Sequence, residues 1–171
     1  MEDRWSDEEA ARCVARYAGA HGEALALRTY SSRLIGAEPG LVLHGGGNTS
    51  VKDVRTNLFG EEAQTLLVKA SGVDLAAIEP EGHVALWLTP LQRLRELPDF
   101  SDEAMINELR AHMLDHGAPN PSIETLVHAF VPGAFKTTGS DLIRELHDRM
   151  VMNRRRVAES RAQPVTTRRA A

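Results

Sequence analysis

The chain has 171 residues, 42% hydrophobic and 26% charged, with a formal net charge of −4 at pH 7. This composition excludes a wholly disordered chain, and the length supports one domain with a hydrophobic core. The net charge argues against nucleic acid as the main partner. No stretch approaches the ~18 apolar residues of a membrane span. The single cysteine, Cys13, excludes an internal disulfide. We therefore expect a cytoplasmic protein without a membrane partner.

Two helices are predicted first. Ser6 and Glu9 have the spacing of a capping box, which predicts a helix from about residue 7 to Gly19. A second helix is expected over residues 22–35, where apolar residues recur at helical spacing. Gly36 and the Pro39–Gly40 pair predict the end of that helix and a turn.

The middle of the chain alternates short strands with short helices. Strands are predicted over residues 41–43, 49–55, 65–69 and 83–88, with 49–55 the return partner of 41–43. Helical segments are predicted over residues 74–78 and 90–97, then from the Ser101 cap to near Gly117, and finally from a Ser122 cap through Phe130. Interleaved strands and helices indicate an α/β fold.

The charge changes along the chain. Residues 137–171 hold eight arginines and four acids, so the first 136 residues hold 12 of the 20 bases and 20 of the 24 acids. We interpret residues 1–135 as the folded domain and residues 136–171 as a divergent basic tail, helical at first and then disordered.

The stretch HGGGNTSVK, residues 44–52, combines three glycines with polar side chains. Glycine lets backbone N–H groups converge on an anion. Asn48 adds an amide donor, and Lys52 offers charge. The spacing matches neither the P-loop nor G-x-G-x-x-G. An ordinary polar turn between strands is the alternative interpretation.

Two further turns repeat this chemistry. Ser71 and Gly72 follow a predicted strand, and Ser122 precedes a predicted helix, where free N–H groups favour an anion. Three such turns suit one phosphate group. Glu124, beside the third turn, suits proton abstraction, although a glutamate in a first helical turn also complements the helix dipole.

The ordered motifs HGGGNTSVK, LLVKASGVDLAAIEPEG, SDEAMINELR and APNPSIETLVHAF resemble class II aldolases of the adducin-head superfamily. The likeness is greatest to the N-terminal part of bifunctional rhamnulose-1-phosphate aldolase/short-chain dehydrogenase proteins, and it covers about residues 5–135.

The resemblance implies a three-layer α/β/α fold and a usually oligomeric enzyme. The implied reaction is metal-dependent cleavage of a ketose 1-phosphate to dihydroxyacetone phosphate and an aldehyde. It implies that Glu124 exchanges the proton at the enediolate carbon and that a divalent metal, usually zinc, polarises the substrate oxygens. The implied phosphate-binding residues are Gly47, Asn48, Ser71, Gly72 and Ser122.

The resemblance ends where the family carries its His-x-His metal motif. In an ungapped alignment Thr138 and Ser140 occupy those two positions, and neutral hydroxyls are poor zinc ligands. No metal ligand is therefore assigned. We interpret the chain as a truncated or frameshifted family member whose fold is incomplete at the C-terminal end. A diverged, metal-free module is the alternative.

Two functions follow from these observations. The first is aldol cleavage of a rhamnulose-phosphate-type substrate, impaired or lost without the metal motif. The second is a non-catalytic, adducin-like phosphate-binding or assembly module. His112 and His116 are spaced i, i+4 on a predicted helix, but the glutamate of a metalloprotease motif is missing.

Overall fold

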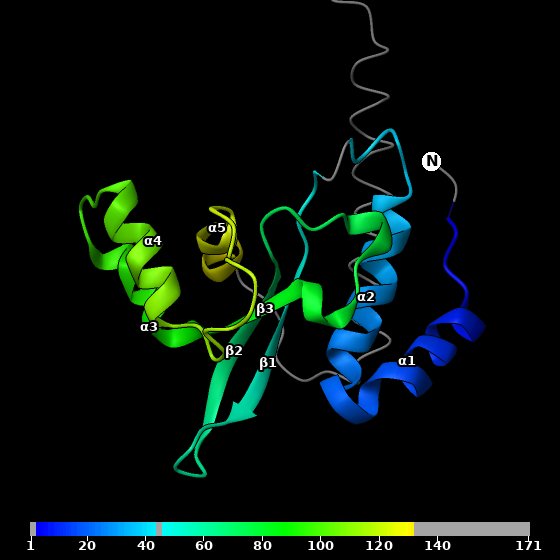
Figure 1. Ribbon diagram of the computed structural model, residues 1–171, viewed down its shortest axis with the longest axis horizontal. Helices are drawn as coiled ribbons and strands as arrows, with labels where there is room; N and C mark the ends of the chain where they lie inside the picture. The colour runs from blue at the N-terminus through cyan, green and yellow to red at the C-terminus, as the bar shows by residue number, and fades with distance from the viewer. Residues whose placement is uncertain (1–2, 44–45, 132–171) are drawn as a thin grey trace, which may run out of the picture.

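A computed structural model describes residues 3–43 and 46–131 (Figure 1). A three-stranded sheet lies between two groups of helices, with α1 and α2 on one side and α3, α4 and α5 on the other (Figure 1). The predicted three-layer α/β/α fold is confirmed for this part of the chain. The predicted basic tail, including Thr138 and Ser140, lies outside the described residues.

The two N-terminal helices form close to the predicted positions. α1 spans Asp7–His21, and the Ser6 hydroxyl accepts a hydrogen bond from the Glu9 N–H at its start, as the capping box predicts. α2 spans Glu23–Gly36. The two helices pack through a core that includes the buried Cys13 thiol.

The sheet is antiparallel, in the order β1-β2-β3, with β1 Ser50–Thr56, β2 Glu62–Lys69 and β3 His83–Trp87. The predicted strand over residues 41–43 is wrong, and β1 pairs with β2 instead. The amides of Leu41 and Val42 both donate to the Glu38 carbonyl, which forms a turn after α2. Val42 then packs against Leu75 and Ile78 rather than joining the sheet.

Short helical segments follow β2 and β3, and the two that follow β2 lie beside α2. They comprise η1 Leu75–Ala77, η2 Pro80–Gly82, α3 Leu88–Arg93, η3 Leu94–Glu96, α4 Asp102–Ala111 and α5 Thr125–Phe130. α3, α4 and α5 cover the sheet face that carries Leu66 and Val68, and this contact forms the largest apolar core. Within the described ranges, no helix is long and apolar enough to span a membrane.

α4 ends at Ala111, six residues before the predicted end near Gly117. The chain beyond it pairs with the outer edge of β3, where Trp87 N–H donates to the His112 carbonyl and Leu114 N–H donates to the Ala85 carbonyl, both at 2.9 Å. The His112 carbonyl and the Leu114 N–H are therefore paired with β3 and are not available to continue the helix.

Candidate functional site: a polar junction of three turns

The second and third predicted turns lie side by side at the C-terminal end of β2. Ala70 and Pro121 form an isolated antiparallel bridge. The Ser71 N–H donates to the Asn120 carbonyl at 2.9 Å. This backbone pairing holds the Ser71–Gly72 turn against the segment that leads to α5.

The first turn joins them through a side-chain contact. Asn48 Nδ2 donates a hydrogen bond to Ser122 Oγ at 2.8 Å. Ser122 is buried, and Asn48 is half-buried with its Oδ1 lacking a hydrogen-bond partner among the described residues. The structure thus brings together the turns that contain Asn48, Ser71 and Ser122. Their binding of phosphate stays a prediction.

Two glycines in these turns have left-handed backbone. Gly47 has φ +74° and Gly72 has φ +76°, a region that other residues rarely adopt. A Cβ on Gly47 would also lie 2.9 Å from Val42 Cγ2 and 3.1 Å from Leu75 Cδ2. The first turn therefore requires glycine for both conformation and space, whereas Gly72 faces open space.

Glu124 lies at the entrance to α5 rather than within its first turn. It holds the N-cap position, so the prediction that Ser122 caps this helix is wrong. The Ser122 hydroxyl is used elsewhere, by Asn48 and by the Glu124 carboxylate. Hydrogen bonds from the Glu124 backbone N–H and from Ser122 lower the pKa of the exposed Glu124 carboxyl, and the charge of Lys69 lowers it further. Glu124 is therefore ionised at neutral pH.

His128 lies one turn beyond Glu124. Its Nδ1 and Ser50 Oγ are 2.9 Å apart, which fixes the ring against the start of β1. Burial is the main cause that lowers the His128 pKa, and the Arg28 charge adds to it. The neutral ring anchors α5 to β1, which gives His128 a structural role.

The cation that adjoins the junction is Lys69, not Lys52. Lys52 is buried and its Nζ donates to the carbonyls of Ala129 and Val131 at the end of α5, so the proposal that it supplies charge to the first turn is wrong. Lys52 pairs with Leu66, so its side chain lies on the sheet face that carries Leu66, opposite the face that carries Lys69. The sequence analysis assigned no role to Lys69, the last residue of β2, although its position two residues before Ser71 places it next to the second turn.

The described residues do not fit the expected metal. Across residues 3–43 and 46–131, no group of three or more His, Cys, Asp or Glu side chains could hold an ion. His112 is paired with Glu108 at 3.3 Å. We therefore derive no metal-dependent step from these residues.

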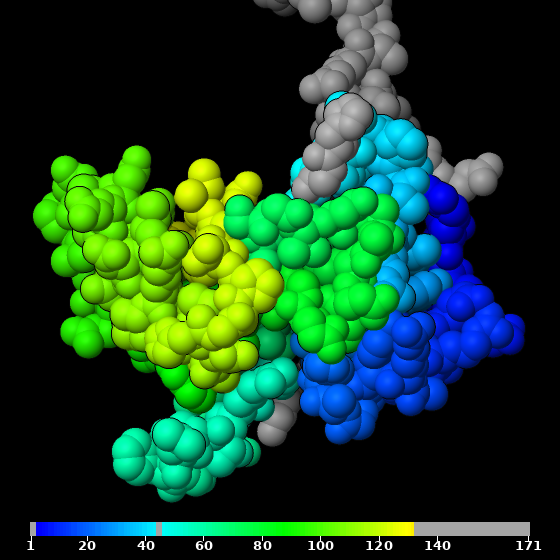
Figure 2. Space-filling view, viewed as in Figure 1, coloured from blue at the N-terminus to red at the C-terminus, as the bar shows by residue number. Residues whose placement is uncertain are grey.

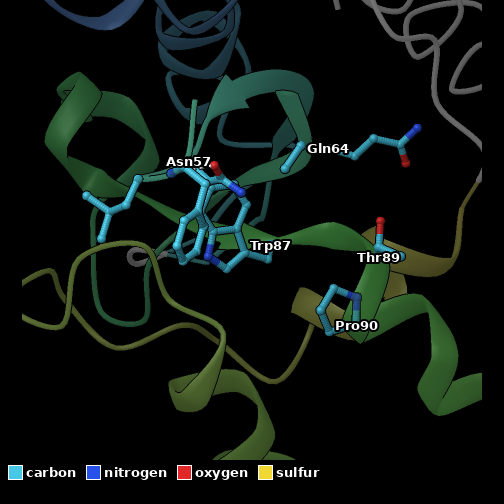
Figure 3. A pocket seen from close by; sticks show the side chains of 8 residues that line it. Asn57, Gln64, Trp87, Thr89 and Pro90 are labelled. Carbon is cyan, nitrogen blue, oxygen red and sulfur yellow. Dashed lines mark hydrogen bonds between the residues drawn. The ribbon is translucent and has the colours of Figure 1, made fainter. Parts of the chain in front are cut away.

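A separate hollow lies at the other end of the sheet. It measures about 420 Å³ and is lined by residues of the β1–β2 hairpin and of the β3–α3 junction: Asn57, Leu58, Phe59, Ala63, Gln64, Trp87, Thr89 and Pro90. Trp87 lies between Asn57 and Pro90 in Figure 3, and Figure 2 shows the hairpin projecting from the body. The eight residues of β2 place it roughly 25 Å from the junction. The hollow is therefore not part of the junction.

A comparison with solved structures finds a protein domain of similar fold. The chain resembles the N-terminal class II aldolase domain of a conserved protein from Thermoplasma acidophilum, with 35% identity and a TM-score of 0.64. The alignment covers 77% of this chain and 56% of that domain. The chain has a class II aldolase-like fold. This confirms the fold class that the four sequence motifs predict.

Two sequence comparisons add further matches. The chain is 40% identical over 103 residues to the uncharacterized oxidoreductase YuxG of Bacillus subtilis. The match covers 60% of this chain and 15% of YuxG. A model described as a family of unknown function, DUF6356, matches residues 121–154, which begin at the third turn of the class II aldolase-like fold.

Proposed function

We propose that the three turns bind the phosphate of a ketose 1-phosphate, of the rhamnulose-phosphate type, in a cytoplasmic class II aldolase reaction. The observation that carries this proposal is the 2.8 Å hydrogen bond from Asn48 to Ser122, which joins the first and third turns. The class II aldolase-like fold supports the reaction class. Backbone N–H groups, hydroxyls and an amide at one point are the donor set that a phosphate requires.

Glu124 is the proposed proton-transfer residue. In aldol cleavage the carbon–carbon bond breaks as the substrate hydroxyl loses its proton, an aldehyde is released, and the enediolate that remains becomes dihydroxyacetone phosphate when it gains a proton on carbon. Because Glu124 is ionised at neutral pH, it can accept a proton released in the cleavage and return one to the enediolate carbon. Lys69, whose charge reaches Glu124, supports the ionised form between turnovers.

The family's divalent metal would polarise the substrate carbonyl and hydroxyl oxygens. Because Thr138 and Ser140 occupy the two positions of the family's His-x-His motif, we propose that catalysis by this chain is impaired or lost, whereas phosphate binding is retained. A non-catalytic phosphate-binding module is the second candidate. The ionised, hydrogen-bonded state of Glu124 favours it, because this state also stabilises the turn without any reaction.

The test measures binding and cleavage separately. Binding of dihydroxyacetone phosphate is followed by calorimetry, and cleavage of rhamnulose 1-phosphate by coupled reduction of the released dihydroxyacetone phosphate, with and without added zinc. Glu124→Gln should retain binding and abolish any cleavage, whereas Glu96→Gln, at an exposed position, should change neither. Binding without cleavage supports the module. Absence of binding overturns both candidates.

A further inference from the structure

Three buried basic side chains lie between α2 and the sheet. Arg28 on α2 is 5% exposed, Lys69 on β2 is 4% exposed and His83 on β3 is 6% exposed. Lys69 and His83 are directly opposite each other in the β2–β3 ladder, which places their Cβ atoms about 5 Å apart. Both lie on the sheet face opposite the Leu66 and Val68 side chains, because strand side chains alternate.

α2 brings Arg28 to the same face. Ser32, one turn after Arg28, shares a hydrogen bond of 2.7 Å with Thr49, and its hydroxyl also donates to the Arg28 carbonyl at 2.6 Å. The Thr49 carbonyl in turn accepts a hydrogen bond from the Lys69 backbone N–H, at 2.9 Å. The charges of Arg28 and Lys69 both lower the pKa of His83, so both lie within electrostatic reach of the imidazole.

These groups lack acidic partners. Arg28 Nη1 donates to Ser31 Oγ at 3.3 Å, but Arg28 Nε is buried and has no hydrogen-bond partner in the described part of the chain. The buried ring nitrogens of His83 form no hydrogen bond of ordinary geometry there, although the backbone of Glu79 and Pro80 lies close enough to raise the His83 pKa slightly against the larger effect of burial. Within residues 3–43 and 46–131, Lys69 Nζ donates a hydrogen bond only to the Ala70 carbonyl, at 3.5 Å. Among the described residues neither Arg28 nor Lys69 forms an ion pair.

Burial without a counter-charge is strongly unfavourable for a guanidinium and an ammonium group. Desolvation lowers the Arg28 pKa to about 10, and no carboxylate of the described residues compensates its charge. Burial and the two neighbouring cations lower the His83 pKa to about 4, which keeps the ring neutral with one N–H to donate. An anion is the ligand that these donors share.

We propose that Arg28, Lys69 and His83 form a buried binding site for a small oxyanion, a phosphate or a carboxylate. The site shares Lys69 with the three-turn junction, whereas Arg28 and His83 belong to the buried site alone. Arg28→Gln and His83→Gln therefore separate this proposal from the aldolase proposal. Arg28 supplies a planar pair of donors, Lys69 a point charge and His83 a neutral N–H.

The experiment uses the full chain in the Asn48→Ala background, so that the three-turn junction contributes little to anion binding. Thermal unfolding and calorimetric titration are measured with inorganic phosphate and with acetate, at constant ionic strength set by sodium chloride. We expect phosphate or acetate at about 100 times its dissociation constant to raise Tm by about 5 °C or more. The anion that acts identifies the ligand as a phosphate or a carboxylate.

Two variants test the site itself. Arg28→Gln and Lys69→Gln should each weaken binding at least tenfold, and they should melt at or above the parent temperature in anion-free buffer, because an uncompensated charge has been removed. Arg28→Lys should restore part of the affinity. His83→Gln provides a neutral third variant if either charge variant fails to fold. The proposal is overturned if neither anion binds, or if the variants bind both anions as the parent does.

Discussion

Asn48 and Ser122 are 74 positions apart in sequence, and a single 2.8 Å hydrogen bond joins their side chains. It connects the glycine-rich turn before β1 to the segment before α5. Asn48→Ala removes this donor. We expect it to weaken dihydroxyacetone phosphate binding about tenfold or more, in keeping with a lost hydrogen bond to a charged ligand.

The control for Asn48→Ala is Gln64→Ala. Gln64 is an exposed residue of β2 near the hairpin, and its replacement should leave affinity unchanged. Calorimetric titration of both variants compares the two effects. Equal affinity of Asn48→Ala and the unmodified chain would remove the first turn from the site.

Alanine substitutions at three glycines separate strain from crowding. Gly47, Gly60 and Gly72 all have positive φ, but only a Cβ on Gly47 would meet neighbouring atoms within 4 Å. Left-handed backbone costs about 1–2 kcal/mol for alanine, and overpacking adds about 1–3 kcal/mol. Gly47→Ala should therefore lose about 3 kcal/mol of unfolding free energy, and Gly60→Ala and Gly72→Ala about 1 kcal/mol each. Urea unfolding measures all three, and equal losses would contradict the crowding at Gly47.

Stability should fall on acidification because of His83. Its pKa is lowered to about 4 in the folded chain, mainly by burial, against 6.5 for the unperturbed group. Between these two values the unfolded state binds a proton that the folded state does not, so the unfolding free energy decreases as pH falls from about 6.5 to about 4. The loss is on the order of 3 kcal/mol.

His83→Gln isolates this contribution from the other titrating groups. The variant cannot take up the proton, so its stability should change less across the same pH range. Urea unfolding at pH 7, 5.5 and 4.5 gives the difference between the two proteins. Parallel pH profiles would show that His83 is not buried as a neutral ring.

Lys52 and Lys69 should respond differently to substitution. Lys52→Met leaves the carbonyls at the end of α5 without their donor, so we expect a loss of about 1–2 kcal/mol of stability and unchanged dihydroxyacetone phosphate affinity. Lys69→Met should reduce that affinity, because Lys69 is the cation beside the second turn. Thermal melts and calorimetry on both variants test the assignment. A larger loss of affinity in Lys52→Met would reverse it.

Local sequence signals predicted most of the elements. Ser6 predicted the start of α1, and Gly36 and Pro39 predicted the end of α2. These signals succeed because helix caps and helix-terminating residues act within a few residues of the chain. The strand predicted over residues 41–43 failed because a short apolar run cannot be distinguished from a turn that packs apolar residues into the core. The end of α4 was missed because its backbone groups pair with β3, which is distant in sequence.

The candidate site was predictable in part. The turn chemistry around Asn48, Ser71 and Ser122 indicated one site, and the structure brings these turns together. The roles of Lys52 and Lys69 were not predictable, because which sheet face a lysine occupies depends on register. The register is set by the β1–β2 pairing, which the sequence reasoning had assigned to the wrong partner.

The most direct test of the central claim is a crystal structure of the chain with dihydroxyacetone phosphate. The account predicts the phosphate at the junction of the three turns, within hydrogen-bonding distance of Asn48, Ser71 and Ser122. A phosphate bound at another location, with these three residues unchanged in a well-ordered junction, would contradict it.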